Sequence, residues 1–479
     1  MRRPGRTWLA LDQGGQSSRA ILFDDAGHEL AQARVPITTT RGGDDRVEHD
    51  AGEIVASVRL AATRALAMNP DAPQPTAVGL ATQRSSIVCW QRTTGEPLSP
   101  VLSWQDRRAA AALLPLREHE ARVRRLSGLP LSPHYGATKI RWCLDHLPAV
   151  RAAAGRGELA VGPLATFIAS QLIGHVAAVD PANASRTQLW DAARGDWSSE
   201  LLALFGVERE WLPAPGTTAS DAAMTGPPVP GASLAIVTGD QSAVPFAWGP
   251  PRDDTLFLNL GTGAFLQRTT GARRPEAGAL LGSVLYGDGH RTLYSLEGTV
   301  NGAASAIEWL AAEDGLDLDA AWRRWEATGP VARATPALLF LNGISGLGSP
   351  YWRSDFESRF VGDGDADARF AALVASIAYL VRENFEALQG AGPITRVIAT
   401  GGLARSDGLM QLLADLCGVR LERPSRSEAT ALGVLGLLVQ DGAQALPTDS
   451  MQAFDPDPAR RAEAGFRRWR DAMPRVPGR

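Results

Sequence analysis

Cysteine is scarce in this chain of 479 residues, and its three cysteines follow no recognisable pattern. Cys89, Cys143 and Cys417 are widely separated and lie outside any metal-ligand spacing, which disfavours both a disulfide framework and a zinc site. We expect buried free thiols in a reducing cytoplasm.

Long apolar runs and an excess of positive charge are also missing. The apolar run from Trp8 to Leu11 is too short for a signal-peptide core, and no other run approaches the length of a membrane span. A formal net charge of -4, with nearly all the positive charge on arginine, gives no basic field for nucleic acid. The sequence therefore predicts a cytoplasmic protein that acts on small molecules and binds neither nucleic acid nor a membrane.

Two common nucleotide-binding motifs are absent as well. The pattern GxxxxGK followed by Ser or Thr does not occur, and no GxGxxG opens a strand–helix–strand unit. The sequence thus supports neither a P-loop kinase nor a Rossmann dehydrogenase.

The composition that remains is that of an ordinary globular protein. It has 44% hydrophobic and 21% charged residues, and its length favours two or three domains. Strand-like residues 8–11 and 19–24 flank a Gly-rich turn, and Asp50 precedes an amphipathic helical pattern with Glu53 at its third position. These signals predict a first, mixed α/β lobe over residues 1–244.

A second lobe is predicted over residues 245–450. Residues 255–263 repeat the opening plan of an apolar strand that runs into a Gly/Thr turn, through either a duplication of the lobe or a chance match. The last stretch, 451–479, is charged and Arg-rich without a clear apolar face, so we expect a surface helix or tail there.

Three apolar strands end in glycine turns, at residues 14–15, 261–263 and 401–402. Glycine lets backbone amides approach phosphate oxygens closely, although each turn alone is more often structural. Asp12 and Asp240 each end a strand, where Asp12 can hold a hydrated Mg²⁺ and Asp240 can accept a proton from a hydroxyl that attacks a phosphate. An Asx turn for Asp12 and a capping role for Asp240 are the structural alternatives.

These residues resemble the family of ATP-dependent, FGGY-type carbohydrate kinases that includes glycerol kinase, xylulose kinase and gluconate kinase, and glycerol kinase most of all. The similarity runs in order from about residue 8 to 440. The segments that carry it are DQGGQSSRAILFD at 12–24, VEHD at 47–50, GLATQRSSIVCW at 79–90, TGEPL at 94–98, WQDRR at 104–108, TKIRWCLDH at 138–146, NASRTQLWD at 183–191, GDQ at 239–241, GTGAF at 261–265, LEGTV at 296–300 and GLGSPYW at 346–352.

The resemblance implies an α/β fold of two actin-like (ribonuclease H-like) ATPase lobes that close over MgATP and a small polyol or sugar in an interlobe cleft. It implies that Asp240 is the general base and that Asp12 and Asp240 lie at the metal. The sequence does not give the oligomeric state, and a homodimer and a homotetramer are the two candidates. The implied acceptor-binding positions are Arg84, Ser85, His134, Tyr135, Asp240, Gln241 and Phe265. The implied nucleotide-binding positions are Asp12, Gly14, Gly15, Gln16, Arg19, Thr262, Gly263, Ala304, Glu308, Gly402 and Ser406.

The acceptor side departs from the glycerol kinase pattern at two positions. Ser85 stands where a glutamate usually accepts a glycerol hydroxyl, and His134 aligns with a tyrosine, which removes a second contact unless Tyr135 swings in. Each lost polar partner costs about 1–3 kcal/mol, although water or Tyr135 can restore such contacts. A more spacious pocket suits a longer polyol or a sugar.

The nucleotide side departs too. Gly15 and Gln16 replace two threonines of the first phosphate loop, and Ala304 and Glu308 replace a glycine and a glutamine beside the nucleotide. A charge at Glu308 is unfavourable there unless the side chain points outward.

The resulting hypothesis is an ATP-dependent phosphotransferase that acts on a small polyol or sugar. Two alternatives stay open at this point: a catalytically weak nucleotide- or polyol-binding sensor of the same fold, and an ATPase of the actin or heat-shock-chaperone type.

Overall fold

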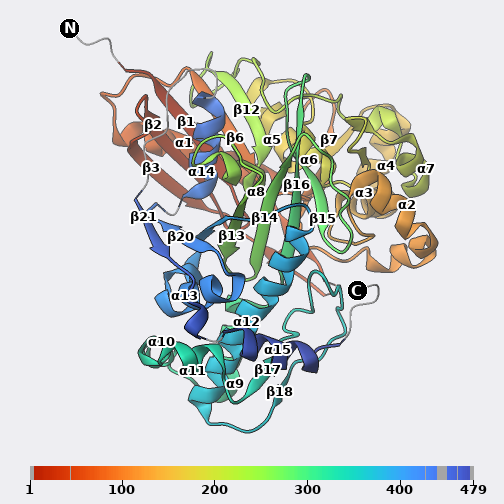
Figure 1. Cartoon of the computed structure of the whole chain (residues 1–479). Helices are drawn as coiled ribbons and strands as arrows, with labels where there is room; N and C mark the ends of the chain where they lie inside the picture. Colours follow the sequence, from red (N-terminus) through yellow and green to blue (C-terminus); the bar gives the residue numbers. More distant parts are fainter. Residues whose placement is uncertain (1–4, 44, 427, 440–449, 461, 475–479) are drawn as a thin grey trace.

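The structure is a computed structural model that describes residues 5–43, 45–426, 428–439, 450–460 and 462–474 (Figure 1). The strands of the first part are β1 (Thr7–Gln13), β2 (Ser17–Asp24), β3 (Glu29–Pro36), β4 (Thr40–Arg41), β5 (Val47–His49), β6 (Ala77–Thr82), β7 (Ile87–Gln91), β8 (Val101–Leu102), β9 (Leu159–Pro163), β10 (Trp190–Asp191), β11 (Asp196–Trp197) and β12 (Ser233–Gly239). The helices of this part are α1 (Ala51–Met68), η1 (Ala110–His119), α2 (Glu120–Ser127), α3 (Gly136–His146), α4 (Pro148–Gly155), α5 (Leu164–Ile173), α6 (Pro181–Ser185), α7 (Ser199–Phe205), η2 (Arg209–Trp211), α8 (Asp240–Ala243) and η3 (Val244–Phe246).

The second part has its own strands and helices. Its strands are β13 (Thr255–Leu260), β14 (Ala264–Gly271), β15 (Leu281–Gly287), β16 (Thr292–Val300), β17 (Leu339–Leu341), β18 (Arg359–Val361), β19 (Arg396–Thr400), β20 (Arg420–Pro424) and β21 (Met451–Phe454). Its helices are α9 (Ala304–Asp314), α10 (Leu318–Ala327), α11 (Pro330–Ala334), α12 (Ala366–Gln389), η4 (Gly402–Arg405), α13 (Asp407–Cys417), α14 (Ala429–Val439), η6 (Pro458–Arg460) and α15 (Ala462–Ala472).

Two mixed sheets form the centres of two lobes and repeat one plan. The first has the order β12-β6-β1-β2-β3, with β1 antiparallel to β2 and parallel to β6. The second has the order β15-β16-β14-β13-β19-β20-β21, with β13 antiparallel to β14 and parallel to β19. In each lobe the opening strand therefore lies between its hairpin partner and a parallel strand, as the echo between residues 8–24 and 255–263 suggested.

Helix α1 begins where the sequence predicts. The Asp50 carboxylate caps it by accepting a hydrogen bond from Glu53 N at 2.7 Å. The predicted apolar stripe is buried under the first sheet at Ile54, Val55, Val58, Ala61 and Ala62. Capping and apolar periodicity were thus sufficient to place this helix.

The two lobes are interlocked by elements that leave one lobe and pack on the other. The β15–β16 hairpin enters the first lobe, where Val284 and Tyr294 join its core. Helix α14 packs in the opposite sense against β1, β6 and α8, and Figure 1 shows it beside the red N-terminal strands. The boundary at residues 244/245 stays a prediction.

The C-terminal segment differs from the expected surface helix or tail. Strand β21 pairs with β20 at the edge of the second sheet, and α15 buries Phe466 and Trp469 in the core of the second lobe. The apolar positions of α15 are spaced at helical intervals, which makes a narrow stripe between exposed arginines. That stripe is easily missed in an Arg-rich sequence.

Glycines let α14 approach the first lobe closely. A Cβ atom at Gly433 would lie 2.0 Å from the Ala243 carbonyl oxygen, and one at Gly79 would lie 2.3 Å from Val434 Cγ1. The helix can therefore seat directly against the short helix α8.

We predict that Gly433→Ala destabilises the protein, because the added methyl group must push α14 away from the backbone of α8. The expected loss is about 1–3 kcal/mol in the free energy of unfolding, measured by urea titration. Gly226→Ala is the matched control, because nothing lies within 4 Å of its Cβ position. Equal stability of the two variants would contradict the tight seating of α14.

Candidate active site

The two aspartates that the sequence singled out lie at one edge of the first sheet. Asp12 is near the end of β1, and Asp240 directly follows β12; both strands run parallel to β6, which lies between them. Because the carboxyl ends of parallel strands meet at the same edge, the two carboxylates share one crevice.

The negative charge of Asp240 acts on the carboxyl group of Asp12. Burial and the negative charge of Asp240 raise the pKa of Asp12 to about 7, and Arg19 opposes this shift. Burial likewise raises the pKa of Asp240, opposed by Arg84 and by the Gln241 N–H, which donates to Asp240 Oδ1 at 2.7 Å. The Asp240 side chain keeps 25% of its surface exposed, so it remains accessible to a ligand.

A buried charge cluster lies beside Asp240 and joins the two lobes. Arg84 grips Glu297 of β16 with both terminal nitrogens, at 2.7 and 3.1 Å, and Arg186 donates to the same carboxylate at 3.0 Å. Gln267 and Ser295 also donate to Glu297, each at 3.2 Å. These donors lower the pKa of the fully buried Glu297 to about 2 despite its desolvation.

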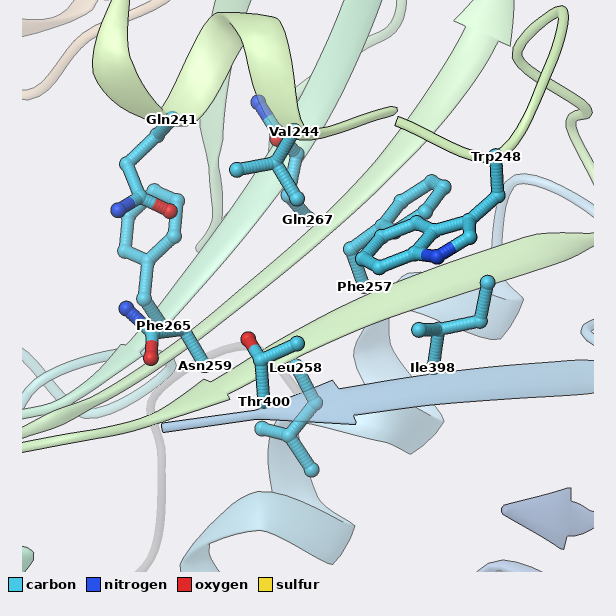
Figure 2. A pocket seen from close by; sticks show the side chains of 10 residues that line it. All are labelled: Gln241, Val244, Trp248, Phe257, Leu258, Asn259, Phe265, Gln267, Ile398 and Thr400. Carbon is cyan, nitrogen blue, oxygen red and sulfur yellow. The ribbon is translucent and has the colours of Figure 1, made fainter. Parts of the chain in front are cut away.

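Aromatic rings complete this side of the crevice. The Arg84 guanidinium lies 5.3 Å from the ring centre of Phe265, and Arg186 lies 5.2 Å from that of Tyr135. Gln241 and Phe265 line a cavity between the lobes (Figure 2). The structure thus brings the predicted residues Arg84, Tyr135 and Phe265 into one cluster, with Asp240 4.0 Å from Arg84 Nε.

The other two predicted acceptor residues, Ser85 and His134, are the chain neighbours of Arg84 and Tyr135. Ser85 follows Arg84 in a left-handed backbone conformation, with φ of 65°. The His134 ring shares a hydrogen bond with the backbone carbonyl of Trp104 at 3.2 Å, and burial lowers the pKa of His134 to about 4, which leaves the ring neutral at pH 7. Neutral Nδ1–H therefore donates to Trp104 O. His134 supports Trp104, while Tyr135 reaches the arginine cluster.

The first predicted phosphate loop is the β1–β2 turn. Gly14 N–H donates to Ser17 O at 3.0 Å and closes the turn, while Gln16 is exposed at its tip. Arg19 lies opposite Asp12 in the β1–β2 register and pairs with Glu428, just before α14. Gly15 lies under Trp104, whose indole nitrogen is 3.8 Å from the position of an added Cβ.

The second predicted loop is the β13–β14 turn at Gly261, Thr262 and Gly263. Its carbonyls accept the first amides of α9, since Ala303 and Ser305 donate to Thr262 O and Ala304 donates to Gly261 O, each at 3.1 Å. Thr262 is exposed in the turn, and Glu308 is exposed on α9. The exposure of Glu308 meets the condition that its charge point outward.

The third predicted loop follows β19. Gly401 adopts φ of 96°, and a Cβ atom there would lie 2.5 Å from Leu260 O. Only glycine therefore fits where the ends of β13 and β19 lie next to each other. Gly402 is exposed. Ser406 is buried and caps α13, and its hydroxyl donates to Glu326 at 2.5 Å. Glu326 also accepts from Gly408 N, so a carboxylate already occupies the N-terminus of α13.

The donor set at the crevice fits a magnesium ion. Among the described residues there is no cluster of three or more His, Cys, Asp or Glu side chains that could enclose a metal. Mg²⁺ typically binds one or two carboxylates together with substrate phosphates and water, and the Asp12–Asp240 pair supplies the two carboxylates. Burial first, and then the charge of Asp240, raise the pKa of Asp12, and a bound cation would offset both effects.

Two family descriptions match this chain in order. The FGGY family of carbohydrate kinases, N-terminal domain, matches residues 7–246, and the C-terminal domain of the same family matches residues 256–439. The chain belongs to the FGGY family of carbohydrate kinases. It is therefore a carbohydrate or polyol kinase with the two-lobed, actin-like fold.

Named relatives agree with the family assignment. A glycerol kinase from Alcanivorax borkumensis is 35% identical over 98% of both chains. The fold matches the crystal structures of Plasmodium falciparum glycerol kinase with ADP, at 21% identity over 98% of this chain and 97% of that one, and of a xylulose kinase from Brucella ovis, at 23% identity over 98% and 99%. The TM-scores are 0.90 and 0.87. No helix within the described ranges combines the length and the apolar character that a membrane crossing requires.

Sequence reasoning missed four residues that surround the predicted ones. Arg186, Glu297 and Gln267 complete the charge cluster, and Trp104 covers the first phosphate loop. A signal existed for Glu297, because a carboxylate within the apolar run Leu296 to Val300 must find buried partners. Nothing in the sequence indicated that these partners would come from the other lobe.

We predict that Glu297→Gln destabilises the kinase by about 3 kcal/mol at pH 7, because two buried guanidiniums lose their shared counter-charge. The folded-state pKa of Glu297 is lowered to about 2 from 4.5, so its contribution is present above pH 4.5 and is lost as the pH falls toward 2. Urea unfolding between pH 3 and 7 measures this. The exposed Glu313→Gln is the control, and a pH-independent difference between wild type and Glu297→Gln would contradict the charge assignment.

Proposed function

We propose that this kinase transfers the γ-phosphoryl group of ATP to a hydroxyl of a small polyol or sugar, with Asp240 as the general base. The observation that carries the proposal is the shared crevice of Asp12 and Asp240 at the ends of β1 and β12. The Asp12 carboxylate suits the metal, and the Asp240 carboxylate suits the attacking hydroxyl.

Asp240 has the properties of a base that meets its substrate at the crevice. Burial raises its pKa toward the working pH, and a quarter of its side-chain surface stays open. As the acceptor oxygen bonds to the γ-phosphorus, the bond from phosphorus to the bridging oxygen of ADP breaks and the hydroxyl proton moves to Asp240. Arg84, 4.0 Å away and held by Glu297, orients the carboxylate during this step.

Asp12 and Asp240 would hold Mg²⁺, directly or through water. When bound, the ion neutralises the negative charge of the phosphate oxygens. The glycine turns after β1, β13 and β19 would offer backbone donors for phosphate oxygens.

The acceptor would lie between the charge cluster and the aromatic side chains. Gln241 and the Arg84 guanidinium supply polar contacts, and Phe265 and Trp104 supply apolar walls for substrate carbons. Tyr135 lies against Arg186, which supports it as the replacement for the tyrosine expected at position 134. Ser85 leaves that side without the glutamate of glycerol kinases.

Asp240→Asn is expected to lower acceptor-dependent ADP release by about 10²- to 10⁴-fold while nucleotide binding persists, because the amide cannot accept the hydroxyl proton. ADP release is measured with glycerol, erythritol, xylitol, D-xylulose and gluconate, and nucleotide binding by calorimetry. The exposed Asp221→Asn is the control.

The same panel separates the other two hypotheses. Binding of an acceptor by wild type without turnover of any acceptor would indicate a sensor, and rapid ATP hydrolysis that ignores every acceptor would indicate an ATPase. Either result would contradict the proposed function.

Ser85→Glu is expected to raise kcat/KM for glycerol about tenfold or more, because it restores a carboxylate that accepts a glycerol hydroxyl. Ser85→Gln has nearly the same size without the charge and is the control. If glutamate and glutamine act alike on glycerol, the missing carboxylate does not limit glycerol use.

A further inference from the structure

Lysine is almost absent from this protein, and the one exception contacts the Ser85 and His134 segments, which we call the acceptor wall. Lys139 is the only lysine among the 479 residues. It is on helix α3 and has no exposed surface. The other basic side chains are nearly all arginine, and the single lysine amine lies where water does not reach it.

The two hydrogen-bond acceptors of Lys139 are backbone carbonyls of the acceptor wall. Its Nζ donates to His134 O at 2.7 Å and to Ser85 O at 3.2 Å. These are the two positions at which the pocket departs from the glycerol kinase pattern. A compact ammonium on a thin stem fits between two carbonyls, whereas the wide, planar guanidinium of arginine does not present its donors in that geometry.

Lys139 also closes a ring of hydrogen bonds through three loops. Ser86 Oγ accepts from Trp104 N at 3.0 Å, and Trp104 O accepts from His134 at 3.2 Å. Lys139 Nζ then donates to both His134 O and Ser85 O, which links the His134 loop back to the loop of Ser85 and Ser86. Without Lys139 this ring of hydrogen bonds is open, and the hydrogen bonds that still join the Ser85 and His134 segments in it run through Trp104.

The backbone conformation of Ser85 needs support of the kind that the Lys139 hydrogen bond gives. A left-handed φ of 65° is unfavourable for serine, and such a conformation persists only where its surroundings hold it. The Lys139 contact fixes the carbonyl of that same residue. Burial lowers the pKa of Lys139 to about 7, and a neutral amine still has two N–H groups for the two carbonyls.

We propose that Lys139 is a positioning residue that sets the shape, and hence the specificity, of the acceptor pocket by tying the Ser85 and His134 segments together. This rests on the proposed function, because the wall that Lys139 supports is the proposed acceptor wall. Lys139 itself touches no substrate and acts through the two carbonyls.

The test is Lys139→Met, which keeps the length of the side chain and removes its donors. The acceptor KM is expected to rise about tenfold or more for the acceptor that wild type uses best, with the nucleotide KM changed by less than about twofold. Arg141→Met is the matched control, because Arg141 is a half-exposed residue of the same helix that pairs with Asp145. A variant that loses activity only in proportion to its lost folded fraction, with an unchanged acceptor KM, would overturn the proposal.

A second measurement needs no variant. Labelling with ¹⁵N-lysine gives one side-chain signal, because the chain has one lysine. That signal is expected to shift when the protein is saturated with the panel compound that binds best, and to stay in place with ADP alone. A signal unmoved by the bound acceptor would overturn the proposal even if Lys139→Met does not fold. Since this experiment needs binding and no turnover, its failure is distinct from that of the proposed function.

Discussion

The candidate site depends on two carboxylates held at one edge of a sheet. Strands β1 and β12 run parallel to β6, which lies between them, so Asp12 and Asp240 reach the same edge although 227 positions separate them in the chain. Burial raises the pKa of both carboxylates, and the charge of Asp240 raises that of Asp12 further, which is unfavourable for the folded protein on its own. Carboxylates with raised pKa values are common at functional sites, where stability is lost in exchange for function.

The second lobe supplies the counter-charge for two buried arginines of the first lobe. Glu297 reaches Arg84 and Arg186 through the β15–β16 hairpin, so two guanidiniums of the first lobe share one carboxylate of the second. Helix α14 crosses in the other direction and seats against α8, which begins at Asp240. The part of the first lobe that carries Arg84 and Asp240 therefore contacts two elements that follow it in the chain.

The altered pocket keeps its support even where its side chains differ from those of glycerol kinases. His134 bonds to the Trp104 backbone, Tyr135 packs against Arg186, and Lys139 holds the carbonyls next to both changes. At these positions the His134 ring and the Lys139 amine therefore both have hydrogen-bond acceptors.

The sequence by itself determined the two-lobed α/β fold, the start of α1 at Asp50 and the identity of the glycine turns, because caps, apolar periodicity and glycine turns are local signals. It also indicated Asp12 and Asp240, since both end apolar strands. Only the tertiary structure decided that α15 is part of the core, that a carboxylate fills the N-terminus of α13, and that Glu297 joins Arg84 and Arg186. Those facts depend on contacts between residues far apart in the chain, and charge pairing across lobes leaves no periodic trace in a single sequence.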